Sequence, residues 1–173
     1  MGEKTVKQTW DDELDEMDLE ILRLLQQNGR MTNAALAEAV GLTPTPMLQR
    51  IKKLETRGVI RGYRAVIDPL AMGHSLLAYV AVQMTEHKLH THQGFVNAVS
   101  KLPEVLECHH ISGEEDFLLK VLTKDMLGYE NFLLHKLTGI PGIARVKTTF
   151  VLSSPKMETA IPIESPAGGK KGE

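Results

Sequence analysis

An internal repeat of 38 residues limits what most of this chain can fold into. A shift by 38 positions aligns Val96 with Leu134, and the Leu-Pro pair at 102–103 with the Ile-Pro pair at 140–141. Each copy reads as an extended apolar run, a helical run, a turn at the proline and a second extended run. The first copy covers 75–84, 89–101 and 105–112, and the second covers 116–123, 126–137 and 144–153. Two such units predict a ferredoxin-like βαββαβ domain over residues 75–154, within an α+β protein.

This domain has a consequence for assembly. A four-stranded sheet with both helices on one face leaves its other face uncovered. The runs 76–82 and 117–121 would place apolar residues on that face. A second copy of the chain commonly buries such a face, so we expect at least a dimer. No apolar run has the length of a membrane span, so we expect no membrane partner.

Residues 14–64 show a different pattern, with three short helical runs separated by glycine-containing turns. Apolar residues recur at helical spacing from Leu14 to Leu25, and Asn28-Gly29 ends this first run. Thr32 is placed to cap a second helix over 33–40, which Gly41 ends. Three short helices with tight turns predict a helix-turn-helix.

The third helix of this group has one apolar edge and one polar, basic face. The apolar edge is formed by Met47, Leu48, Ile51 and Leu54. Thr43 or Thr45 can cap its start. We favour Thr45, with Pro46 as the first helical residue, because the residue before a proline resists the helical conformation. Gly58 is placed to end the helix.

Basic charge is concentrated at this helix and just after it. Residues 50–64 contain six lysines and arginines against Glu55 alone, whereas residues 1–49 contain four against nine acids. The formal net charge of the chain is only −2, which argues against binding nucleic acid by bulk attraction. A local basic patch fits a DNA-binding surface. The alternative interpretation is an ordinary solvated amphipathic helix.

The remaining segments have simpler patterns. Residues 1–13 are polar and acidic and predict a flexible arm, and the Pro-, Gly- and Lys-rich residues 155–173 predict a flexible tail. Residues 59–67 read as extended chain, similar to the wing or hinge strand of a winged helix, and 65–74 as a linker. Cys108 is the only cysteine, so no intrachain disulfide can form and a reducing cytoplasm is expected.

A series of short motifs in order along the chain resembles the Lrp/AsnC family of bacterial and archaeal regulators, over roughly residues 14–152. The motifs are Leu14-Asp15-x-x-Asp18-x-x-Ile21-Leu22, Asn28-Gly29-Arg30, Val40-Gly41-Leu42-Thr43-Pro44-Thr45-Pro46, Arg50-Ile51-Lys52-Lys53-Leu54-Glu55, Gly58-Val59-Ile60-Arg61-Gly62-Tyr63, Glu107-Cys108-His109, Ser112-Gly113-x-x-Asp116-Phe117-Leu118-Leu119 and Ile140-Pro141-Gly142. Each motif is weak alone, but their order is specific.

The resemblance implies a transcription factor that binds double-stranded DNA through the helix-turn-helix. From their position on the polar face we expect Thr45, Gln49 and Lys53 to reach base edges, and Pro46 to offer at most an apolar contact. The basic residues Arg50, Lys52, Arg57 and Arg61 are expected to hold phosphates. The complete set of DNA-binding candidates is Thr43, Thr45, Pro46, Gln49, Arg50, Lys52, Lys53, Arg57 and Arg61.

The resemblance also implies that the second domain oligomerises, as dimers and as rings such as octamers, and senses an amino acid between dimers. The implied effector residues are Ser112, Gly113, Glu114, Glu115, Asp116, Met126, Thr138, Thr148, Phe150 and Leu152. A zwitterion needs an acceptor for its ammonium, from Asp116 or a backbone carbonyl, and donors for its carboxylate, from N–H groups of the glycine turn. Three acids on one turn are, alternatively, simply solvated.

The histidines raise two further interpretations. His87-x-x-His90-x-His92 has metal-ligand spacing, but no cysteine or carboxylate set completes a site, so we expect exposed histidines and no metal. Sirohaem decarboxylases resemble this family in fold and use histidines near a tetrapyrrole. An enzyme would not need the basic helix, and no phosphate loop or nucleophile elbow is present, so we expect a regulator without catalytic activity or cofactor.

Overall fold

The computed structural model describes residues 14–86 and 88–164. The chain divides into two compact units, one comprising residues up to Val66 together with those from Glu158 onward, and the other Ile67–Met157. The sequence predicts a helix-turn-helix domain over 14–64, a linker over 65–74, the ferredoxin-like domain over 75–154 and a tail from 155. The expected arm, His87 and residues 165–173 of the expected tail lie outside the described residues.

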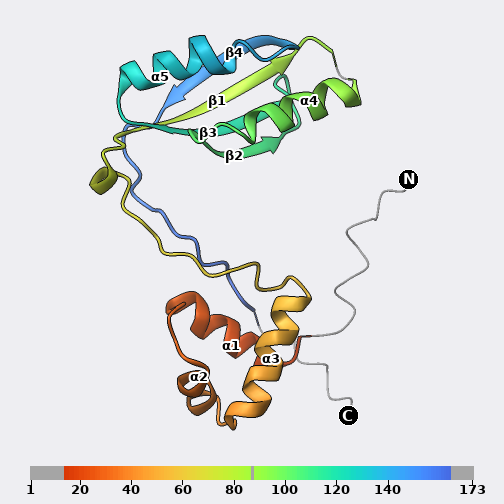
Figure 1. The fold of residues 1–173 in the computed structure, drawn as a ribbon, viewed down its shortest axis with the longest axis vertical. Helices are drawn as coiled ribbons and strands as arrows, with labels where there is room; N and C mark the ends of the chain where they lie inside the picture. Colours follow the sequence, from red (N-terminus) through yellow and green to blue (C-terminus); the bar gives the residue numbers. More distant parts are fainter. Residues whose placement is uncertain (1–13, 87, 165–173) are drawn as a thin grey trace, which may run out of the picture. The chain divides into compact units, whose positions relative to one another are not determined.

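The first unit contains three helices, α1 (Glu16–Gln27), α2 (Asn33–Ala39) and α3 (Pro44–Thr56) (Figure 1). Asp15 caps α1 by accepting a hydrogen bond from the Asp18 N–H. Thr32 caps α2, as predicted, by accepting a hydrogen bond from the Ala35 N–H. The three helices share one buried core, which contains Ile21, Leu36, Ala37, Met47, Ile51 and Leu54. The predicted helix-turn-helix is therefore confirmed as a packed unit.

The start of α3 differs from the prediction. The helix begins at Pro44, with Thr43 as the N-cap residue, although the Thr43 side chain makes no capping hydrogen bond. The sequence favours Thr45 as the cap and Pro46 as the first helical residue, which is two residues later. Both prolines fit inside the first turn, because the N–H groups there have no acceptor within the helix. The bias against a helical residue before proline is a preference that packing of Met47 overrides here.

Two features of this unit add to the sequence pattern. Leu48 belongs to the apolar edge of α3, but its side chain is 53% exposed. Residues 59–67 were expected to be extended chain similar to a wing or hinge strand, and they pair with no strand in the described part of the chain. An extended segment becomes a strand only where a neighbour takes up its hydrogen bonds, and no segment among residues 14–86 and 88–164 pairs with it.

The second unit begins with the short 3₁₀ helix η1 (Leu70–Met72) and continues as the predicted repeat (Figure 1). Its elements are β1 (Leu76–Met84), α4 (Leu89–Val99), β2 (Val105–His110), β3 (Phe117–Thr123), α5 (Met126–Phe132), the π-helical turn η2 (Leu133–Leu137) and β4 (Ile143–Phe150). The strands form one antiparallel sheet in the order β2-β3-β1-β4, so the predicted ferredoxin-like fold is confirmed.

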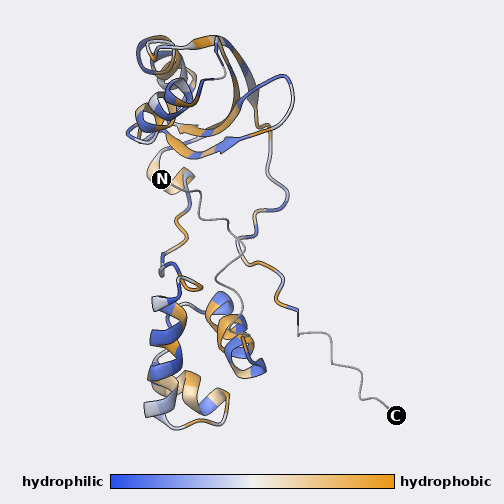
Figure 2. Cartoon of the chain, turned by 90° about the vertical axis from the view of Figure 1, so that its right-hand side faces the viewer, coloured by the Kyte–Doolittle hydropathy of each residue, from blue (hydrophilic) through white to orange (hydrophobic). Residues whose placement is uncertain are grey.

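The core of this unit lies between one face of the sheet and the helices. Alternate residues of β1 and β3, such as Val80 and Leu119, are fully buried together with Phe95 of α4 and Phe132 of α5. Both helices therefore cover the same face of the sheet, and its strands are rich in hydrophobic residues (Figure 2). The opposite face carries partly exposed apolar side chains, including Tyr79, as the sequence predicted.

Candidate nucleic-acid interface and effector turn

The polar face of α3 is open to solvent. Thr43, Thr45, Gln49, Lys52 and Lys53 are all exposed, while Met47, Ile51 and Leu54 point into the core. Hydrophilic residues occur along the length of this helix (Figure 2). The helix therefore presents amide, hydroxyl and ammonium groups to solvent, which are the groups that hydrogen-bond to base edges and phosphates.

Arg50, on the border of this face, is engaged elsewhere. Its Nη1 lies 2.6 Å from Asp15 Oδ2 and 2.6 Å from Asp18 Oδ1. Asp18 is only 4% exposed. The hydrogen bonds to the two carboxylates raise the pKa of Arg50. This contact, the Arg50 clamp, ties α3 to the start of α1, whereas the sequence predicts that Arg50 holds a phosphate.

The other candidates on this unit differ in exposure. Arg61 is exposed, whereas Pro46 and Arg57 are half-buried at the two ends of α3. Beside the helix, a cavity of about 410 Å³ is lined by residues of all three helices together with Tyr63. The Tyr63 hydroxyl donates to Glu55 Oε1 at 3.2 Å, and burial together with this bond raises the pKa of Tyr63. The exposed Leu48 lines the same cavity.

The predicted effector turn, residues 112–116, joins β2 to β3. Ser112, Gly113 and Glu114 are exposed, and Gly113 has a φ of 134°, which side chains disfavour. Glu115 is half-buried, with Oε1 3.8 Å from Lys147 Nζ of β4. The turn thus presents carboxylate oxygens and main-chain N–H groups to solvent, which suits a zwitterionic ligand.

Asp116 behaves differently from the rest of this turn. It is 7% exposed, and its Oδ2 accepts a hydrogen bond of 2.7 Å from the buried N–H of Met84. The β1–β4 pairing shifts register at Gln83/Met84, and a bulge of this kind leaves main-chain groups out of the ladder. The Asp116 main chain also bonds to Val82 and Ile111. Asp116 therefore ties the turn to the end of β1.

The other predicted effector residues are spread over the unit. Met126 is 54% exposed at the start of α5, and Thr138 donates to the Leu134 carbonyl. Thr148 hydrogen-bonds to the Tyr129 hydroxyl, and Phe150 packs edge-on against the Tyr129 ring. The fifth residue, Leu152, lies beyond the end of β4 and is 98% exposed. The structure does not gather these five residues around the turn.

Three aromatic side chains, which the sequence analysis did not combine, form a cluster next to the turn. The His92 ring lies 5.4 Å from His110 and 5.2 Å from Phe117, centroid to centroid. His92 Nε2 is 4.0 Å from Asp116 Oδ1. The strand register places His109 and His110 on opposite faces of the sheet. No group of three or more potential ligands in the described residues is placed to hold a metal ion.

Comparison with known proteins follows the division into two units. A winged helix-turn-helix DNA-binding family model matches residues 14–61, and the Lrp/AsnC ligand binding domain matches 77–161. The leucine-responsive regulatory protein of Escherichia coli strain K12 is 37% identical over 153 residues, covering 88% of this chain and 93% of its own. The chain belongs to the Lrp/AsnC family.

Solved structures of Lrp/AsnC proteins have the same fold. A transcriptional regulator from Neisseria meningitidis, solved in complex with L-Met, has a TM-score of 0.80 at 38% identity, covering 86% of this chain and 96% of its own. Escherichia coli AsnC has a TM-score of 0.78 at 26% identity, covering 86% and 98%. The chain is thus a DNA-binding transcriptional regulator with an effector-binding domain. None of the described helices is long and apolar enough to cross a membrane.

Proposed function

We propose that this protein is a cytoplasmic, sequence-specific regulator without catalytic activity, controlled by an amino acid. The observation that carries the proposal is the presence, in one chain, of a solvent-open polar recognition helix and an effector-binding domain whose Neisseria meningitidis relative was solved with L-Met. Two α3 helices of a dimer would enter successive major grooves, about 34 Å apart on a pseudo-palindromic site.

Within α3, Gln49 is the proposed base reader, because an amide donor and acceptor together match adenine. Thr45 and Lys53 flank it on the exposed face, and Thr43 lies at the helix start. Lys52 and Arg61 are exposed cations that would hold phosphates. We do not include Arg50 among the proposed phosphate contacts, because its Nη1 already bonds to Asp15 and Asp18 in the Arg50 clamp.

The proposed effector site is the turn 112–116, completed between dimers. Main-chain N–H groups around Gly113 would bind the carboxylate of the amino acid. The exposed Glu114 is the proposed acceptor for the ammonium group, because Asp116 is already committed to the Met84 N–H. Met126, Thr138, Thr148, Phe150 and Leu152 would contribute only through such an assembly.

Assembly is the proposed route from ligand to DNA. The open face of the sheet and the unpaired segment 61–68, with Val66 84% exposed, offer apolar surface to a second copy. Dimers would then associate into a ring such as an octamer. An amino acid that binds one assembly state more tightly than another shifts the population by that difference in affinity alone.

A thermal-shift screen of the twenty L-amino acids on the intact chain tests this proposal. A ligand present at about 1,000 times its Kd stabilises the folded state by about 4.1 kcal/mol, which is a readily measured rise in Tm. Glu114→Gln should abolish the rise, whereas Glu130→Gln, an exposed change on α5, should not. The absence of any stabilising L-amino acid, with DNA binding unaffected by all twenty, would refute amino-acid control.

A further inference from the structure

The first unit contains a segment that is separated from it in sequence by the whole effector-binding domain. Residues 158–164 group with the helical unit although the chain crosses Ile67–Met157 before reaching them. The sequence predicts a flexible tail over 155–173, which includes this segment. We call residues 158–164 the strap, and two of them, Ile161 and Ile163, are hydrogen-bonded to α1.

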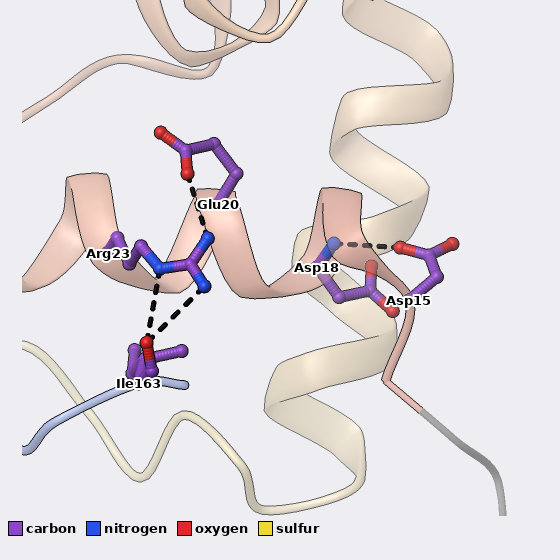
Figure 3. A network of polar contacts seen from close by, with 5 residues as sticks. All are labelled: Asp15, Asp18, Glu20, Arg23 and Ile163. Atoms are coloured by element: carbon purple, nitrogen blue, oxygen red, sulfur yellow. Dashed lines mark hydrogen bonds and ion pairs between the residues drawn. The ribbon is translucent and has the colours of Figure 1, made fainter. Parts of the chain in front are cut away.

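The contacts are specific and directed at the strap backbone. Gln26 Nε2 donates to the Ile161 carbonyl at 3.0 Å, and the Ile161 N–H donates to Gln26 Oε1 at 2.7 Å. Three residues earlier on α1, Arg23 donates through Nε and Nη2 to the Ile163 carbonyl, both at 3.3 Å (Figure 3). Glu20 Oε2 holds the same guanidinium at 3.0 Å.

The spacing of Arg23 and Gln26 along α1 matches the spacing of the Ile163 and Ile161 carbonyls along the strap. Residues three apart on a helix share one face, and residues two apart in extended chain point their carbonyls to the same side. Pro162 lies between the two bonded residues; it has no N–H that needs a partner, and it favours extended conformation in the residue before it. The strap is therefore partly ordered before it binds, which lowers the entropy lost on docking.

We propose that the Arg23–Gln26 edge of α1 is a binding surface for an extended, proline-containing peptide, and that the strap is its partner. Ile163 is half-buried but Ile161 is 69% exposed, so recognition depends on main-chain hydrogen bonds more than on side-chain pockets. With the strap bound, the DNA-binding unit is joined to the effector-binding domain by two stretches of chain instead of one.

Hydrogen exchange on the full chain tests the proposal. Removal of the residues after Lys156, or Gln26→Ala, should speed exchange in the C-terminal half of α1. Gln27→Ala is the matched control: Gln27 is the next residue, is exposed and makes no side-chain hydrogen bond in the described structure. A synthetic peptide of residues 156–164 should restore protection to the shortened chain.

The binding of this peptide gives a second, independent measurement. Gln26→Ala removes two hydrogen bonds and should weaken peptide binding by between about fivefold and a hundredfold. Gln27→Ala should leave peptide binding unchanged. Unaltered α1 exchange in both the shortened chain and Gln26→Ala would overturn the proposal, as would equal peptide affinity for the two glutamine variants.

Discussion

The Arg50 clamp makes a quantitative prediction about the DNA-binding unit. Arg50→Ala leaves the carboxylate of Asp18, which is 4% exposed, without its cation. A hydrogen bond to a charged group contributes about 1.5–3 kcal/mol, and the more exposed Asp15 pair adds about 0.2–1 kcal/mol. We therefore expect Arg50→Ala to lower the free energy of unfolding of this unit by about 2–4 kcal/mol.

Hydrogen exchange in the intact chain measures this loss separately from the effector-binding domain. A loss of 2–4 kcal/mol corresponds to exchange about 30- to 1,000-fold faster for the most protected amides of α3. Lys53→Ala, an exposed change on the same helix, is the control and should leave exchange unaltered. Wild-type protection in Arg50→Ala, combined with a salt slope of DNA binding reduced by about one, would show instead that Arg50 contacts phosphate.

The same contact should make the unit sensitive to acid. Burial opposes ionisation of Asp15, but hydrogen bonds from the Asp18 N–H and from Arg50 outweigh it and lower the pKa of Asp15. The stability from Asp15 is therefore fully present above its unfolded pKa of about 3.9 and is lost as the pH falls through the lower folded value. Below about pH 4 the stability difference between wild type and Arg50→Ala should shrink.

Two further changes separate the other proposed roles. Gln49→Ala should lose about 1–3 kcal/mol of discrimination at one base pair, whereas Lys52→Ala should weaken all sequences alike and lower the salt slope by about one. Equal losses on specific and random DNA for both variants would contradict these roles. Asp116→Ala should leave the Met84 N–H without its hydrogen-bond acceptor and lower the free energy of unfolding of the effector-binding domain by about 1–3 kcal/mol. Asp116→Asn should lower it much less. Thermal unfolding identical to wild type in Asp116→Ala would show that this bond stabilises nothing.

The fold was predictable from the sequence because its signals are local. Alternating apolar residues and the proline turns of the repeat located all four strands, and the caps at Asp15 and Thr32 use side chains three residues or fewer from their donors. The predicted extent of each helix and strand differs from the structure by a few residues at most, and the extended segment expected over 59–67 pairs with no strand in the described residues.

The roles of Arg50, Asp116 and the strap were not predictable in this way. Arg50 bonds to Asp18 across 32 residues of sequence, Asp116 to Met84 across 32, and Gln26 to Ile161 across 135. Charge patterning placed Arg50 at the border of a polar face, but only the packing of α1 against α3 decides which way its guanidinium turns. The composition of residues 155–173 predicted a flexible tail. The hydrogen bonds from α1 go to main-chain atoms of Ile161 and Ile163, and such contacts cannot be read from amino-acid composition.

Two segments of chain connect the effector-binding domain to the DNA-binding unit, and they leave that domain at neighbouring positions. β1 begins at Leu76, β4 ends at Phe150, and these neighbouring antiparallel strands pair Ala78 with Phe150. The Val151 N–H then donates to the Leu77 carbonyl at 2.9 Å. Adjacent strands lie about 4.8 Å apart, so the linker to α3 and the segment leading to the strap start side by side. Two connections restrict the rotation of the DNA-binding unit more than one, and release of the strap therefore removes a restraint without altering any residue of α3.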